Sequence, residues 1–171
     1  EALEASLDFI NQYEAAPKMF HKALFLVGDF GVGKTYLLGA VAHELAVKGF
    51  ETTLLHFPTF AGEMKQAISN DKVGPKLDEV KRAPILMIDD IGADSMSAWI
   101  RDEVLGVILQ HRMQEQLPTF FSSNFNMDQL EQHLSVTQRG DEEPLKAKRI
   151  MERVRYLSRE IWVIGENRRN G

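Results

Sequence analysis

Eight residues, from Gly28 to Thr35, constrain the fold of this chain more than any other segment. Their sequence GDFGVGKT fits G-x-x-x-x-G-K-[ST], the pattern of a phosphate-binding loop. An apolar run, residues 23–27, precedes the loop and is typical of a buried strand, and apolar residues at helical spacing follow it over 37–45. A glycine loop between a strand and a helix presents backbone N–H groups and the positive end of the helix dipole to phosphate. The segment therefore predicts nucleotide binding.

Each residue of this loop has an expected task. Lys34, read as an exposed loop lysine, is placed to contact the β- and γ-phosphates, and the Thr35 hydroxyl to bind Mg²⁺. The expected ligand is ATP with Mg²⁺. The expected nucleotide-binding residues are Gly28, Asp29, Phe30, Gly31, Val32, Gly33, Lys34, Thr35 and Tyr36.

Strands and helices are predicted to alternate along the whole chain, which is long enough for one domain at 171 residues. Such alternation, with nearly continuous apolar strands, indicates an α/β fold around a five-stranded parallel sheet. The strands are expected at 23–27, 52–57, 84–88, 119–123 and 160–164. The helices are expected at 2–15, from Thr35 to about Gly49, and at 58–69, 75–82, 100–114, 127–134 and 145–157, with a loop over 135–144.

Polar residues follow two of these strands. Asp89 and Asp90 end the third strand, and Asn124 ends the fourth. Ligands of parallel α/β sheets bind at the carboxyl ends of the strands, where the phosphate-binding loop also lies. Asp89 is expected to hold Mg²⁺, and Asp90, which points differently, to face an attacking water. Many ATPases of this architecture have Glu at the position of Asp90, and the shorter side chain predicts slow hydrolysis.

The basic residues of the last helix leave two interpretations open. Arg149 and Arg153 are four residues apart and share a helix face. Basic residues on helices are usually solvated, but an arginine can also stabilise phosphoryl-transfer charge, even from a neighbouring subunit. Arg169, after the last strand, is a similar candidate. His56 and the other four histidines show no metal-ligand spacing and are interpreted as structural or exposed, and the two tryptophans as packing residues.

Composition narrows the class of protein. The net charge of −5 does not indicate a protein whose whole surface binds nucleic acid, and a local basic patch stays possible. The chain has no Cys, and no apolar run approaches the length of a membrane span. Cytoplasmic location is expected, and no membrane partner. Because the chain starts at Glu1 inside a helical pattern, we expect a fragment whose N-terminal domain is missing.

Four segments together resemble the bacterial replicative-helicase loaders of the AAA+ class of P-loop NTPases. They are GDFGVGKT, ILMIDDIGA, FFSSNF and RIMERVRYLSREIWVIGENRR, in this order along nearly the whole chain. The resemblance implies Asp89 as the Mg²⁺ acid, Asp90 as the catalytic acid and Asn124 as sensor 1. It implies Arg153 as the arginine finger, with Arg149 as the alternative, and Arg169 as sensor 2. It also implies that the C-terminal helical lid of other AAA+ proteins is absent.

The same resemblance implies the partners. Residues 1–17 would be a linker and N-terminal helix, and residues 58–82 a helical insertion that contacts single-stranded DNA weakly. The missing N-terminal domain would bind a hexameric replicative DNA helicase, and self-assembly is possible. Two alternatives stay open: a transposition-helper ATPase, which shares these motifs, and a small-molecule kinase, which shares the phosphate-binding loop.

Overall fold

A five-stranded parallel sheet forms the centre of the computed structural model, which describes residues 1–165. The strand order is β2-β3-β4-β1-β5, and each pair of neighbouring strands is parallel. The strands are β1 (Ala23–Val27), β2 (Thr52–His56), β3 (Ile85–Asp89), β4 (Thr119–Ser123) and β5 (Ser158–Trp162). The predicted α/β fold with a five-stranded parallel sheet is confirmed.

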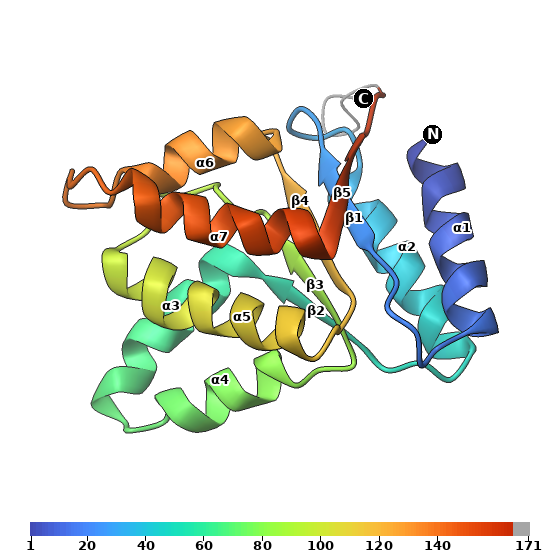
Figure 1. The fold of residues 1–171 in the computed structure, drawn as a ribbon, viewed down its shortest axis with the longest axis horizontal. Coiled ribbons are helices and arrows are strands. Elements are labelled where there is room, and N and C mark those ends of the chain that lie inside the picture. Colours follow the sequence, from blue (N-terminus) through green and yellow to red (C-terminus); the bar gives the residue numbers. More distant parts are fainter. Residues whose placement is uncertain (166–171) are drawn as a thin grey trace.

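Helices cover both faces of this sheet (Figure 1). One face carries α1 (Ala2–Ala15) and α2 (Lys34–Val47). The other carries α3 (Phe57–Ser69), α4 (Val73–Lys81), the π-helical turn η1 (Ile100–Leu105), α5 (Gly106–Gln114), α6 (Met127–Ser135) and α7 (Pro144–Leu157). Among the described residues, no helix follows β5.

Alternate strand residues supply two separate cores. Leu24 and Leu26 of β1 pack with α1 and α2, whereas Phe25 and Val27 pack with the helices of the opposite face. All five residues of β1 are buried, as are all five of β3 and of β4, because helices cover both faces. This is why β1 and residues 85–88 of β3 read as continuous apolar runs rather than as alternating patterns, whereas the buried residues of β4 include Thr119, Ser122 and Ser123.

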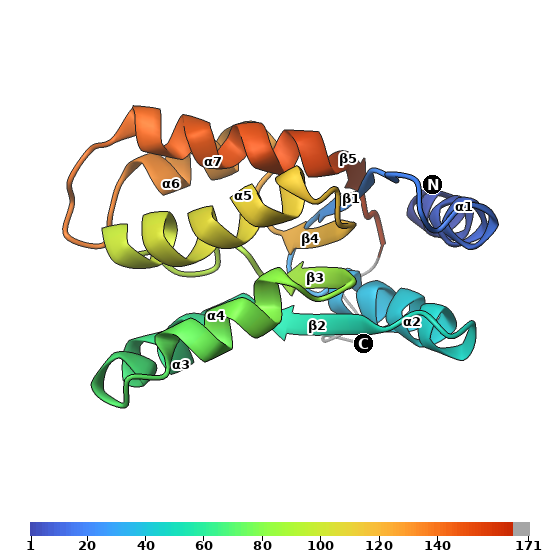
Figure 2. The ribbon, with the colours of Figure 1, turned by 60° about the horizontal axis from the view of Figure 1, so that its bottom comes forward.

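The helices α3 and α4 form a pair next to the edge strand β2. Figure 2 shows the pair extending from the sheet beyond the carboxyl end of β2. Arg112, a fully buried arginine of α5, holds the C-terminal end of α4. It donates hydrogen bonds to the carbonyls of Lys81 and Ala83. Further bonds reach Pro118 O and Thr119 Oγ1, and burial lowers the pKa of Arg112 to about 9.

Most expected boundaries differ from the structure by one or two residues, and two of these differences change the description of an element. The last strand is Ser158–Trp162 rather than 160–164, because its ladder with β1 pairs Ala23 with Ser158 and Val27 with Trp162. The expected helix over 100–114 begins as the π-helical turn η1 before it continues as α5. No helix among residues 1–165 is both long and apolar enough to cross a membrane.

Candidate functional site

The phosphate-binding loop connects β1 to α2 at the carboxyl edge of the sheet. Gly31 and Gly33 have positive φ angles of 82° and 98°, a conformation that side chains with a Cβ rarely adopt. Gly28 begins the loop, and its N–H donates to Ser123 O at the end of β4 over 3.3 Å. A Cβ on Gly28 would lie 2.5 Å from the Val163 carbonyl oxygen, so only glycine fits under the segment that follows β5.

Lys34 is buried, with 5% of the residue exposed, which corrects the expectation of an exposed loop lysine. Its ammonium donates to Gly28 O over 2.7 Å, to Asp29 O over 2.8 Å and to Asn124 Oδ1 over 3.0 Å. The carbonyl oxygens of Gly28 and Asp29 both accept hydrogen bonds from this nitrogen. These bonds explain how a cation is accommodated at a buried position. The loop lysine and the amide at the end of β4 therefore lie in one place, although 90 residues separate them.

Thr35, the residue after Lys34, contacts Asp89 at the end of β3. The Thr35 hydroxyl lies 3.0 Å and 3.1 Å from the two carboxylate oxygens of Asp89. Asp89 is 3% exposed, and the Ser122 hydroxyl of β4 donates to its Oδ1. A hydroxyl and a buried carboxylate side by side are oxygen ligands of the type that Mg²⁺ prefers.

Asp90 has different surroundings from Asp89. Its φ is 59°, which turns the chain sharply at the end of β3, and its N–H donates to Ser122 Oγ over 2.9 Å. Its side chain is 38% exposed, and Oδ2 lies 3.0 Å from His56 Nε2. Sequence reasoning missed His56. The available signal was its position at the end of the strand that precedes β3 in the chain.

One pocket of about 270 Å³ lies between the loop and the strand ends, and neither Asp89 nor His56 is among its lining residues. Phosphate-loop residues and the polar ends of two neighbouring strands line it together. The lining residues are Phe30, Gly31, Gly33, Lys34, Thr35, Tyr36, Asp90 and Asn124. The parallel sheet brings them together because the carboxyl ends of its strands share one edge.

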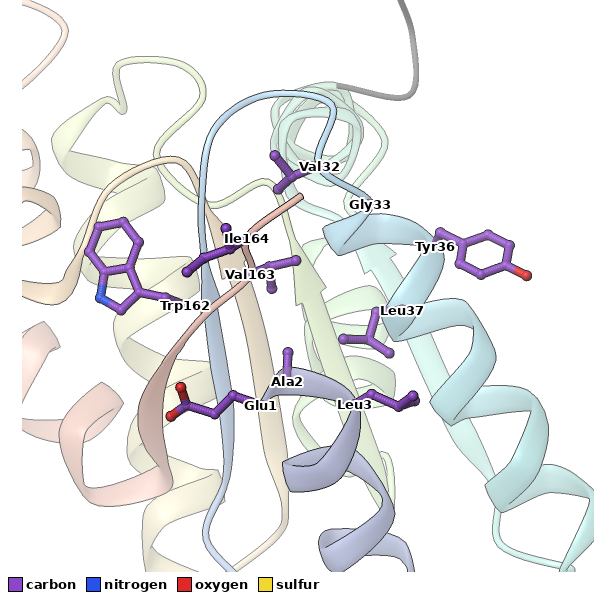
Figure 3. A pocket seen from close by; sticks show the side chains of 10 residues that line it. All are labelled: Glu1, Ala2, Leu3, Val32, Gly33, Tyr36, Leu37, Trp162, Val163 and Ile164. Atoms are coloured by element: carbon purple, nitrogen blue, oxygen red, sulfur yellow. The ribbon is translucent and has the colours of Figure 1, made fainter. Parts of the chain in front are cut away.

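A second pocket of about 420 Å³ adjoins the first, and both are lined by Gly33 and Tyr36. Figure 3 shows Ala2, Leu37 and Val163 around a common space between α1, the start of α2 and the segment after β5. Trp162 also lines this pocket and is 49% exposed, so it is not a core residue, whereas Trp99 packs against the core as expected. No local sequence pattern indicates this pocket, because its walls come from three segments that are far apart in the chain.

The arginines of α7 do not line either pocket. Arg153 Nη1 donates to Gly106 O over 2.7 Å, beside a different pocket of about 350 Å³. Burial, together with the charge of nearby Arg149, lowers the pKa of Arg153. Arg149 itself is exposed, and Arg155 forms ion pairs with Asp128 and Glu131 of α6. Arg169 lies outside the described residues.

Comparisons with known proteins agree with this geometry. The family model "IstB-like ATP binding protein" matches residues 4–170. The replicative helicase loader DnaI of Bacillus subtilis (strain 168) is 50% identical over 163 residues, which cover 95% of this chain and 52% of that protein. The chain thus spans about half the length of this relative.

Two solved structures share the fold. A crystal structure of DnaI superposes with a TM-score of 0.83 at 44% identity, over 93% of this chain and 83% of that one. A putative primosome component from Streptococcus pyogenes serotype M3 superposes with a TM-score of 0.78 at 49% identity, over 98% of this chain and 80% of that one. Because the family model matches residues 4–170, nearly the whole chain, this chain belongs to the family of IstB-like ATP-binding proteins.

Proposed function

We propose that this chain is the ATP-binding and ATP-hydrolysing part of a replicative-helicase loader. The observation that carries the proposal is the convergence of Lys34, Thr35, Asp90 and Asn124 on one pocket at the carboxyl edge of the sheet. The high identity to a helicase loader supports the biological role. The activity would belong to the cytoplasm, where ATP and the replicating chromosome are.

The two adjoining pockets suggest how ATP would lie. The triphosphate would occupy the pocket of the phosphate-binding loop, where Lys34 and the N–H groups at the start of α2 face it. The nucleoside would extend past Gly33 and Tyr36 into the apolar pocket beside Trp162. Thr35 and Asp89 are the residues that would hold Mg²⁺, which neutralises phosphate charge when bound.

Hydrolysis would depend on Asp90, which lines the pocket as a partly exposed carboxylate. It is the candidate to orient and deprotonate the attacking water, and the amide of Asn124 also lines the pocket. Because Arg153 and Arg149 lie away from this pocket, an arginine of α7 would act on the ATP of a neighbouring subunit.

We further propose that the partners are a hexameric helicase and single-stranded DNA. Helicase binding would rest mainly on a region outside this chain. DNA would contact the α3–α4 pair, whose basic residues are diluted by acids. The basic residues are Lys65, Lys72, Lys76, Lys81 and Arg82, and the acids Glu63, Asp71, Asp78 and Glu79.

A transposition-helper ATPase is the second candidate, favoured by the name of the family model. Co-purification of the full-length parent with a hexameric helicase distinguishes the two.

Replacement of Lys34 tests nucleotide binding. Lys34→Ala should weaken ATP binding at least about tenfold, since a hydrogen bond from a charged group contributes roughly 1.5–3 kcal/mol. Isothermal titration calorimetry with Mg²⁺–ATP measures the affinity. Lys48→Ala, just beyond the other end of α2, is the matched control and should bind as the wild type does. Because Lys34 is buried, the urea midpoint of each variant must show that it is folded. Unchanged affinity in folded Lys34→Ala protein rejects the assignment.

Tryptophan fluorescence tests the nucleoside pocket. Trp162 is at the edge of this pocket, and its indole points to the side of β5 opposite Val163 (Figure 3). A nucleoside packed against Val163 should therefore change the Trp162 emission through the segment after β5, whereas inorganic triphosphate, which has no nucleoside, should not. The experiment uses a Trp99→Phe background so that Trp162 is the single tryptophan. Equal changes with both ligands would place the nucleoside elsewhere.

A further inference from the structure

The pocket of about 350 Å³ beside Arg153 shares no lining residue with the two pockets of the candidate nucleotide site. It lies on the face of the sheet where α5 is placed between α4 and α7 (Figures 1 and 2). Five of its lining residues follow one face of α5 at helical spacing, and α4 and α7 each add one basic side chain. The lining residues are Lys81, Asp102, Gly106, Val107, Gln110, His111, Gln114 and Arg153.

Two cations of this pocket have no acidic partner. Lys81 and Arg153 are partly buried, and neither forms an ion pair within the described part of the chain. Asp102 is the one acid among the lining residues, and its carboxylate is already bound by buried Arg101 over 2.8 Å and by Lys146 over 3.5 Å. The pocket therefore carries positive charge that its own acid does not neutralise.

His111 is subject to the same positive charge. Burial lowers its pKa, and positive neighbours lower it further. The charged neighbours that lower this pKa are Arg82, Lys81 and Arg112, and Glu115 acts against them. The pKa of Arg153 is likewise lowered, by burial and then by Arg149. Like charges thus act on residues of α5 and of α7, and an anion in the pocket would offset them at both.

The surroundings of the pocket favour a compact anion over a long one. Three exposed carboxylates lie close enough to act on the charges of its lining residues, although none of them lines it. They are Asp78, Glu115 and Glu152. A nucleic-acid strand that crosses this surface would meet these acids, whereas a small anion inside the pocket would not.

We propose that this pocket, within a single chain, binds a small polyphosphate anion of the pyrophosphate class. Lys81 and Arg153 would donate charge-assisted hydrogen bonds to its oxygens, and protonated His111 a third. The amides of Gln110 and Gln114 supply neutral donors on the same face of α5. The inference goes beyond the proposed function and does not depend on ATP at the phosphate-binding loop.

Nuclear magnetic resonance of the chain with ¹³C-labelled histidine tests binding. Pyrophosphate is added without Mg²⁺, at a protein concentration where sedimentation velocity shows single chains. It should shift the His111 signal and raise the His111 pKa, because a nearby anion favours the imidazolium. Loss of the signal in His111→Asn assigns it. His43, exposed on α2, is the internal control and should not respond. No response of His111 at millimolar pyrophosphate overturns the proposal.

Replacement of single cations tests the residues of the site. Lys81→Ala and Arg153→Ala should each weaken pyrophosphate binding about tenfold or more, because each removes a charged donor. Lys148→Ala, an exposed lysine of α7 outside the pocket, removes the same charge and should bind nearly as the wild type does. Urea midpoints show that each variant is folded, and Lys81→Ala decides the test if Arg153→Ala is not. Unchanged binding by Lys81→Ala, or equal weakening by Lys148→Ala, overturns the assignment.

Two further measurements separate this site from other phosphate sites. Folded Lys34→Ala protein should keep the full His111 response, and loss of the response there would assign it to the phosphate-binding loop and overturn the proposal. Oligo(dT) should leave the His111 signal in place. A response to oligo(dT) and none to pyrophosphate would make the pocket a nucleic-acid site instead. Failure of the wild-type chain to bind ATP in calorimetry contradicts the ATPase function and leaves the expected His111 response unaltered.

Discussion

Asp89 and Asp90 are neighbours in the chain, yet the structure gives them different partners. Asp89 is enclosed by the hydroxyls of Thr35 and Ser122, whereas Asp90 turns through a positive φ and reaches His56 at the surface. The turn is fixed because the Asp90 N–H is bonded to Ser122 and the next N–H to the carbonyl of the same residue. Hydrogen bonds to Ser122 of β4 therefore hold Asp89 in a buried position and Asp90 in an accessible one.

This difference predicts different effects of the same substitution. Asp90→Asn should bind ATP as the wild type does and lose hydrolysis by at least about a hundredfold, the usual contribution of a general base. Asp89→Asn should instead weaken ATP binding only when Mg²⁺ is present, because the proposed buried ligand of the metal is lost. Calorimetry with and without Mg²⁺ and a phosphate-release assay measure the two properties. If both variants behave identically in both assays, the proposed division of roles is wrong.

At the scale of elements, the segment after β5 packs onto the phosphate-binding loop. Val163 N–H donates to Val27 O over 2.7 Å, and the Val163 carbonyl lies against Gly28. The same segment forms one wall of the apolar pocket in Figure 3. The end of the sheet and the loop therefore support each other, and a change in one is expected to change the other.

Two glycine substitutions test this packing. Gly28→Ala should destabilise the fold by about 1–3 kcal/mol, the usual cost of overpacking, and should weaken ATP binding, because the added Cβ would meet a backbone oxygen. Gly39→Ala is the matched control in α2, where a Cβ meets nothing within 4 Å. It should stabilise the chain by up to about 1 kcal/mol through helix propensity. Urea unfolding measures both, and a stable, ATP-binding Gly28→Ala protein would show that the loop and the β5 extension are independent.

At the scale of the whole molecule, the phosphate pocket and the arginines of α7 are on different parts of the surface. Arg153 donates to the carbonyl of Gly106 next to the π-helical turn, and it lines a pocket with Lys81 and His111. If ATP occupies the phosphate pocket as proposed, a lone subunit cannot place this arginine on its own nucleotide. Either Arg153 or the exposed Arg149 remains available to a neighbour.

Mixing two inactive proteins tests action between subunits. Arg153→Ala keeps the phosphate-binding loop, and Lys34→Ala keeps the arginine, so a mixture should regain part of the ATPase activity that each protein lacks. A trans-acting arginine contributes roughly 10³–10⁵ in rate, so wild-type specific activity should also rise with protein concentration. Arg153→Ala should retain its ATP affinity. Full activity of Arg153→Ala, or turnover independent of protein concentration, contradicts the trans arrangement. The same mixing and concentration experiments with Arg149→Ala test the alternative residue.

Local sequence was sufficient for the elements of this fold. The helix at 2–15 and the strands at 23–27 and 119–123 have the predicted bounds, because periodicity and flanking breakers are properties of adjacent residues. The phosphate-binding loop is likewise a contiguous motif, and the acids after β3 and the amide after β4 could be placed at one sheet edge from the alternation of elements alone.

Tertiary structure decided what depends on strand order and on packing between distant segments. The contact of His56 with Asp90 exists because β2 is next to β3 in the sheet, and no pattern within β2 indicates it. The apolar pocket requires α1 and the end of β5 to meet beside the loop, and the register with β1 sets β5 two residues earlier than its apolar run suggests. The burial of Lys34 and Arg112 has the same origin. Each cation lies inside because carbonyls from separate segments converge on it, and only the folded chain brings those segments together.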